Sequence, residues 1–227
     1  MLKEIIKSRI ITDLFRYPYG ILLNEKEKII RNAMIFASFS NLKGDYLEFG
    51  VWEGKSFISA YKFAEIFNLN EMNFYAFDSF KGLPITCGSE REKFKEGMYQ
   101  CSVEEFKGNL SRNNIDMSKV KIIEGWYKDT LNKSTKKKLG IKEAAVIMVD
   151  CDLYASTIPV LDFITDYLVT GTIIIFDEWF AFKGDPNKGE QKAVNRWLKK
   201  NPNIKLIEYK KYGCAGNSFI VHLCEEK

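Results

Sequence analysis

The sequence predicts an α/β fold with a mostly parallel sheet that is covered by helices on both faces. From residue 45 onward, short apolar runs alternate with segments of helical periodicity, as in strand–helix–strand crossovers. Two of the runs, at residues 144–150 and 172–177, contain no regular polar alternation, which is typical of central strands buried on both faces. The 227 residues include no internal repeat and no Pro/Ser-rich linker, so one domain with a helical extension is the simplest interpretation.

The N-terminal 40 residues are expected to be helical. Apolar residues recur at helical spacing from Leu2 to Leu14, and a second helix is expected to begin near Asn24, a favourable N-cap residue. We therefore divide the chain into a helical extension or lid at residues 1–40 and a main domain at residues 41–227.

The elements of the main domain follow from periodicity and from turn residues. Strands are expected at residues 45–50, 73–78, 119–124, 144–150, 172–177, 204–209 and 218–224. Helices are expected at residues 56–67, 103–113, 128–139, 156–168 and 190–200. The short link between the last two strands predicts that one of them is antiparallel.

Composition excludes several classes of function. Hydrophobic residues make up 46% of the chain and charged residues 28%, as is usual for a globular protein. The net charge of +4 comes from 34 basic and 30 acidic residues, a balance that argues against a nucleic-acid partner. The five cysteines form no C-x-x-C pair, so a reducing, cytoplasmic location is expected. The N-terminus has no long uninterrupted apolar stretch and predicts no membrane span.

The first candidate binding motif joins a strand to a helix through a glycine turn. Glu48 precedes Gly50 and Gly54, and glycines at such a turn let the backbone approach a ligand closely. The nicotinamide-dinucleotide pattern G-x-G-x-x-G is absent, which disfavours a dehydrogenase. The turn is also one residue shorter than the phosphate-binding loop, although Gly-Lys-Ser follows, which disfavours a nucleotide triphosphate. A purely structural turn would explain the glycines but not Glu48.

Acidic residues also follow three later strands. Asp78 stands where a carboxylate can accept hydrogen bonds from ribose hydroxyls. The motifs 150–152 (Asp-Cys-Asp) and 177–178 (Asp-Glu) end the two apolar strands. If those strands are neighbours, four carboxylates crowd together and repel, and no Lys or Arg adjoins either motif. A divalent cation, Mg²⁺, Mn²⁺ or Ca²⁺, would resolve the repulsion. Helix caps and solvated strand ends are the alternative interpretation.

Five motifs together carry a family resemblance: LEFGVWEGKSF, FDSFKGLP, EGWYKDTL, VDCDLYAST and IIIFDEW. Over roughly residues 25–200 the chain resembles the macrocin-type sugar O-methyltransferases, which are metal-dependent class I enzymes that use S-adenosylmethionine. The resemblance implies a Rossmann-like fold with seven strands and a homodimer. It implies methyl transfer to a hydroxyl of a sugar or a sugar-containing small molecule, assisted by Mg²⁺ or a similar cation such as Mn²⁺.

The resemblance also implies roles for individual residues. Those expected to bind the cofactor lie after the first three strands: Glu48, Gly50 and Ser56 at the methionine part, Asp78 and Ser79 at the ribose, and Gly125 and Trp126 beside the adenine. Those expected to bind the metal are Asp150, Asp177 and Glu178. Asp152 is expected to act as the general base.

Two positions depart from the family pattern. Cys151 stands where the family usually has Gly, and Glu178 stands where it usually has Asp. Glu can still ligate a metal because it reaches one methylene further. Two other functions stay open, namely methylation of a catechol or another phenol, and cofactor binding without catalysis. His222, the only histidine, is expected at a surface or sheet edge and not in catalysis.

Overall fold

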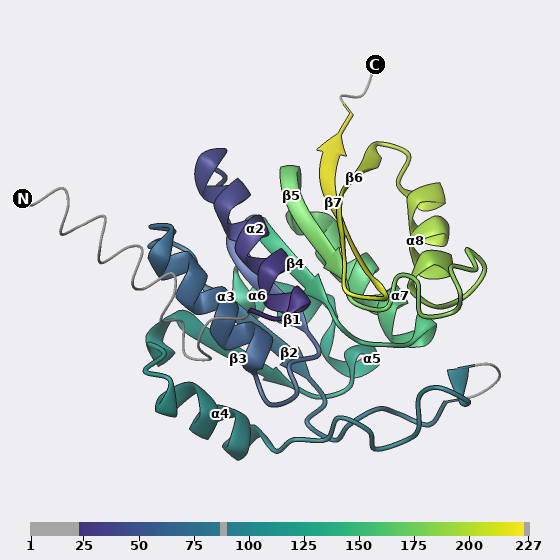
Figure 1. Cartoon of the computed structure of the whole chain (residues 1–227), viewed down its shortest axis with the longest axis horizontal. Coiled ribbons are helices and arrows are strands. Elements are labelled where there is room, and N and C mark those ends of the chain that lie inside the picture. The colour runs from purple at the N-terminus through teal and green to yellow at the C-terminus, as the bar shows by residue number, and fades with distance from the viewer. Residues whose placement is uncertain (1–22, 87–89, 225–227) are drawn as a thin grey trace, which may run out of the picture.

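The computed structural model describes residues 23–86 and 90–224, so the helix expected from Leu2 to Leu14 lies outside the described residues. A seven-stranded sheet runs through the molecule in the order β3-β2-β1-β4-β5-β7-β6 (Figure 1). The strands are β1 (Asp45–Phe49), β2 (Phe74–Asp78), β3 (Val120–Glu124), β4 (Ala144–Val149), β5 (Leu168–Phe176), β6 (Ile204–Tyr212) and β7 (Gly216–Leu223).

Strand directions agree with the predicted topology. β1 to β5 pair in parallel, and β7 is antiparallel to both β5 and β6. The sheet is therefore mixed, with one reversed strand as the short final link predicts. The two apolar runs form β4 and β5, which are neighbours within the sheet.

Helices cover both faces of the sheet, because successive strand residues point to opposite sides. On one face, alternate residues such as Tyr46 pack with α2 (Glu25–Phe39), α3 (Lys55–Ile66) and α4 (Val103–Arg112). Figure 1 shows α2 and α3 in front of the sheet. On the other face, residues such as Leu47 pack with α7 (Tyr154–Ile164) and α8 (Gly189–Lys200).

Two predicted elements differ from the observed ones. The single helix expected at residues 128–139 is two helices, α5 (Tyr127–Thr130) and α6 (Lys133–Leu139). Asn132 separates them, because its side chain accepts a hydrogen bond from the Thr135 N–H and starts a new helix.

The other difference concerns the junction of α7 and β5. The helix expected at residues 156–168 ends at Ile164, and a 3₁₀ turn (Thr165–Tyr167) leads directly into β5 at Leu168. The strand thus begins four residues before the apolar run. Its pairing with β4 is irregular between Leu168 and Ile173, where Gly171 adopts a φ of +105°. This bulge interrupts the apolar pattern and hides the start of the strand from sequence analysis.

The helix α2 is part of the main hydrophobic core. Ile29, Ile30, Ala33 and Met34 are buried in the same cluster as residues of α3 and β4. The domain boundary placed at residue 40 stays a prediction. Within residues 23–86 and 90–224, no helix combines the length and apolarity that crossing a bilayer requires.

An aromatic cluster on the face of the sheet that α7 covers provides a test of the packing. Phe163 of α7 is 2% exposed, and its ring lies 5.5 Å from Phe77 and 6.3 Å from Phe49 between centroids. Phe163→Ala is expected to lower the free energy of unfolding by about 3–5 kcal/mol, the usual cost of such a cavity. The matched control is Phe39→Ala at the end of α2, where the side chain is 86% exposed and the expected change is within about 0.5 kcal/mol. Urea unfolding measures both, and equal losses would contradict this packing.

Candidate active site

A cavity of about 470 Å³ opens at the carboxyl ends of the parallel strands, within the ~300–1,000 Å³ usual for ligand sites. It brings together most of the residues that the sequence singles out. Its wall includes Gly50, Asp78, Ser79, Gly125, Trp126, Asp150, Asp152, Asp177 and Glu178. Trp52 and Tyr99 also line it and lie 5.6 Å apart in an edge-to-face arrangement.

Asp78 organises the turn that follows β1. One of its carboxylate oxygens accepts hydrogen bonds from the backbone N–H groups of Val51 (2.9 Å) and Trp52 (3.1 Å). The other accepts one from the Phe80 N–H (2.8 Å). A carboxylate offers about four acceptor positions, so Asp78 can still accept a hydrogen bond from a ligand hydroxyl. The Ser79 hydroxyl donates a hydrogen bond to the Gly82 carbonyl oxygen (3.0 Å), and both residues line the cavity.

Glu48 and Ser56 lie behind the cavity wall and not on it. Glu48 is fully buried and accepts hydrogen bonds from the Ser56 hydroxyl (2.5 Å) and the Tyr46 hydroxyl (2.6 Å). Burial raises the pKa of Glu48 to about 8, although both hydrogen bonds oppose the increase. Gly50, which does line the cavity, has a φ of +90°, and a Cβ there would overlap the Asp150 carbonyl oxygen. The absence of a side chain at Gly50 therefore allows the end of β1 to lie close against the end of β4.

The parallel pairing of β4 with β5 assembles an acidic cluster. Val149 is in register with Phe176, so the residues that follow, Asp150 and Asp177, lie side by side. One oxygen from each of Asp150, Asp177 and Glu178 lies within 4.8 Å of the others. Glu178 Oε2 is buried without a hydrogen-bond partner. A set of carboxylate oxygens with an unsatisfied member fits a hard divalent cation such as Mg²⁺.

Burial changes the protonation of the cluster. It raises the pKa of Asp150 to about 6 and that of Glu178 well above its ordinary value. Asp152 is 6% exposed and adopts a left-handed backbone with a φ of +61°. Burial and then the charge of Asp150 raise the pKa of Asp152 to about 8. A carboxylate with a pKa near neutral is well suited to accept a proton at physiological pH.

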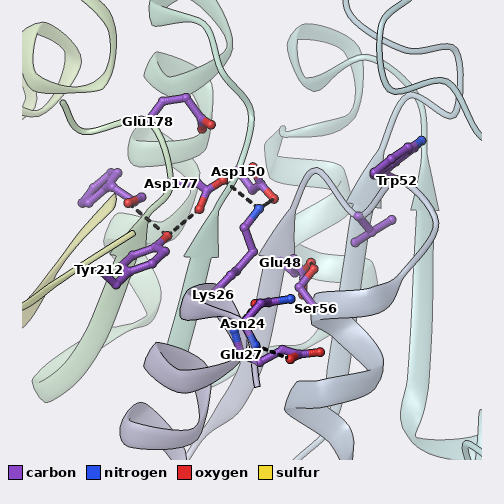
Figure 2. Close-up of polar contacts among 12 residues, drawn as sticks. Asn24, Lys26, Glu27, Glu48, Trp52, Ser56, Asp150, Asp177, Glu178 and Tyr212 are labelled. Carbon is purple, nitrogen blue, oxygen red and sulfur yellow. Dashed lines mark hydrogen bonds and ion pairs between the residues drawn. The ribbon is translucent and has the colours of Figure 1, made fainter. Parts of the chain in front are cut away.

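Sequence reasoning missed the cation that contacts this cluster. Lys26, in the first turn of α2, places its Nζ 2.8 Å from Asp150 Oδ2 and 2.7 Å from Asp177 Oδ2. Figure 2 shows the lysine side chain reaching between the two carboxylates. Burial opposes the charge on Lys26, but the two carboxylates prevail and raise its pKa. No local pattern identifies the contact, because 124 residues separate Lys26 from Asp150.

Two further residues support the cluster and were also missed. The Tyr212 hydroxyl, from the end of β6, donates a hydrogen bond to Asp177 Oδ1 (2.7 Å). Glu190, from the first turn of α8, is 1% exposed and accepts a hydrogen bond from the Glu178 N–H (3.1 Å). Its other oxygen, Oε1, is buried without a partner. His222 is exposed on β7, opposite Lys205 of the edge strand β6, where the sequence predicts it.

The buried carboxyl of Glu48 predicts how stability depends on pH in the cofactor-free protein. Because the pKa of Glu48 is higher in the folded state (about 8) than its ordinary value of 4.5, the folded state binds more protons between these values. Stability should therefore fall as pH rises from about 5 to 8, with a slope of up to ~1.4 kcal/mol per pH unit from this group. Glu48→Gln should flatten that slope in urea unfolding, whereas Glu124→Gln on the exposed end of β3 should not. An unchanged slope in Glu48→Gln would contradict the buried, protonated carboxyl.

Comparison with known sequences places this geometry in a family context. The chain is 29% identical over 143 residues to a tetracenomycin-C rhamnosyl 4'-O-methyltransferase from Streptomyces olivaceus, covering 60% of this chain and 53% of that protein. It is 28% identical over 166 residues to mycinamicin III 3''-O-methyltransferase from Micromonospora griseorubida, covering 69% and 62%. The chain thus spans only about half to three-fifths of the length of these relatives.

Solved structures share the fold. The O-methyltransferase NovP superposes with a TM-score of 0.69 at 23% identity, over 86% of this chain and 78% of NovP. The calicheamicin methyltransferase CalS11 superposes with a TM-score of 0.66 at 18% identity, over 94% and 90%. These matches confirm the Rossmann-like methyltransferase fold. The match to the macrocin-O-methyltransferase (TylF) family covers residues 12–202, and the chain therefore belongs to that family.

Proposed function

We propose that this protein transfers the methyl group of S-adenosylmethionine to a hydroxyl of a sugar or of a sugar-containing small molecule, with the help of Mg²⁺ or a similar divalent cation. One observation carries the proposal. A single cavity holds most of the residues expected to bind the cofactor together with an all-oxygen acidic cluster. Relatives of the family are named as methyltransferases of glycosylated natural products, which supports a sugar hydroxyl as the acceptor.

The cofactor would occupy the part of the cavity formed by β1, β2 and β3. Asp78 and Ser79 would meet the ribose hydroxyls, because Asp78 retains free acceptor capacity beyond its three backbone hydrogen bonds. Gly125 and Trp126 would flank the adenine from the end of β3. Gly50 would face the methionine part, with Glu48 and Ser56 holding the turn from behind.

The acceptor would occupy the part of the cavity formed by β4 and β5. Asp150, Asp177 and Glu178 would hold the divalent cation. When bound, the cofactor supplies an electrophilic methyl group and the cation supplies charge that stabilises a developing alkoxide. Asp152 would accept the proton of the acceptor hydroxyl on its carboxylate, and the walls of the cavity would align that oxygen with the methyl group.

Three properties rest on composition or resemblance alone. The homodimer, the cytoplasmic location and the choice of Mg²⁺ over Mn²⁺ stay predictions.

The function is tested by a methyl-transfer assay on a panel of sugar nucleotides and diphenols, with added Mg²⁺ or with a chelator. Methylation of a sugar hydroxyl is expected in the Mg²⁺ arm, with most turnover lost in the chelator arm because the acids then lack their cation. Mass spectrometry of the products measures both effects. Methylation of diphenols alone would contradict the sugar acceptor, and full activity with chelator, also in Asp177→Ala, would contradict the metal.

The role of Asp152 is tested by Asp152→Asn. Asn tolerates the left-handed backbone of this position but cannot accept the proton, so kcat should fall by about 10²–10⁴-fold. Calorimetry should give an unchanged Kd for S-adenosylhomocysteine. The control is Asp162→Asn on the exposed side of α7, which should keep full kcat. A kcat within twofold of the unmodified protein would remove Asp152 from catalysis.

A further inference from the structure

Lys26 is presented to the acidic cluster by a well-defined helix start. The Asn24 side chain accepts a hydrogen bond from the Glu27 N–H (2.9 Å), and the Glu27 carboxylate accepts one from the Asn24 N–H (2.9 Å). This reciprocal capping box fixes the first turn of α2. Figure 2 shows Asn24 and Glu27 below the extended side chain of Lys26. The position of Lys26 is thus set by the backbone of its helix.

The helix itself is anchored in the core. Glu27 is 5% exposed, and Ile29 and Ile30 on the next turn are buried. Glu27 also accepts a hydrogen bond from the Ser59 hydroxyl of α3 (3.4 Å). Lys26 therefore differs from an ordinary surface lysine, whose ion pairs contribute little.

The ammonium occupies a position that a metal ion would also need. Lys26 Nζ lies within 2.8 Å of one oxygen of Asp150 and one of Asp177, and these two residues belong to the triad that could hold a cation. Mg²⁺ binds its oxygen ligands at about 2.0–2.1 Å. Two cations cannot share the space between the same carboxylates without strong repulsion.

We propose that Lys26 is a tethered cation that competes with the divalent ion for Asp150 and Asp177, so that the ion binds only when the lysine side chain leaves these carboxylates. The inference rests on the proposed metal site and deepens it. Lys26 lines the cavity, so its side chain has space into which it can move. In the metal-free protein it offsets part of the repulsion among the acids. The balance between the two cations then sets the affinity of the site for metal.

The test measures Mn²⁺ binding to the purified, metal-free full chain by electron paramagnetic resonance. Lys26→Met removes the competing charge and keeps an unbranched side chain, so Mn²⁺ should bind more tightly, by roughly 5- to 150-fold if the coupling is of ordinary size. Lys26→Gln should also bind more tightly, and it keeps the proposal testable if the Met variant fails to fold. The control is Lys28→Met, because Lys28 lies on the same turn of α2, is exposed and pairs with Glu25. It should leave Mn²⁺ affinity unchanged.

A second readout does not depend on activity either. Without metal, Lys26→Met should lower the Tm because the acids lose their partner, and added Mg²⁺ should raise the Tm of this variant more than that of the unmodified protein. If the unmodified protein binds Mn²⁺ and both Lys26 variants bind it equally or more weakly, the competition is overturned while the metal site stands. If none of the proteins binds Mn²⁺, both the competition and the proposed metal site are overturned.

Discussion

The parallel pairing of β4 with β5 is the constraint on which the rest of this site depends. With Val149 in register with Phe176, Asp150 and Asp177 must leave the sheet side by side. β4 is apolar and buried throughout, β5 is apolar and buried from Ile173 to Phe176, and both strands lie within the sheet. The register that buries these side chains is therefore the same register that aligns the acids. A slip by one residue would exchange side chains between the two buried faces and would offset Asp150 from Asp177.

Bringing the acids together has an electrostatic cost, which the structure offsets locally. The carboxylates are partly withdrawn from water, and burial together with the charges of Asp150 and Asp177 raises the pKa values of Asp152 and Glu178. Lys26 supplies one positive charge to Asp150 and Asp177, and Tyr212 donates a hydrogen bond to Asp177. Glu178 and Glu190 each retain a buried oxygen without a partner. Lys26 and Tyr212 thus offset the charges of Asp150 and Asp177, whereas Glu178 keeps an acceptor oxygen that a bound cation could satisfy.

The cofactor half of the cavity is stabilised differently. Backbone groups dominate there: Asp78 fixes the turn after β1 through N–H donors, and Gly50 allows β1 to approach β4. Glu48 is the surprise of this region, because the resemblance implies cofactor contact whereas the carboxyl is buried behind the wall among hydroxyl donors. Its position suits a residue that shapes the turn from within the core.

The sequence by itself determined the succession of strands and helices along the chain, the burial of the two apolar strands β4 and β5, and the strand-end motifs, because these depend on local periodicity and on the geometry common to parallel sheets. Only the tertiary structure decided that β4 and β5 are neighbours, that Lys26 reaches Asp150 and Asp177, and that Glu190 accepts a hydrogen bond from the Glu178 N–H. It also decided that Glu48 and Ser56 are off the cavity wall. The bulge at Gly171 also required it, whereas the break at Asn132 comes from a local cap on Thr135 that periodicity alone does not reveal. The physical reason is that such contacts join residues far apart in the chain, and periodicity specifies which face a residue occupies but not which distant residue it meets.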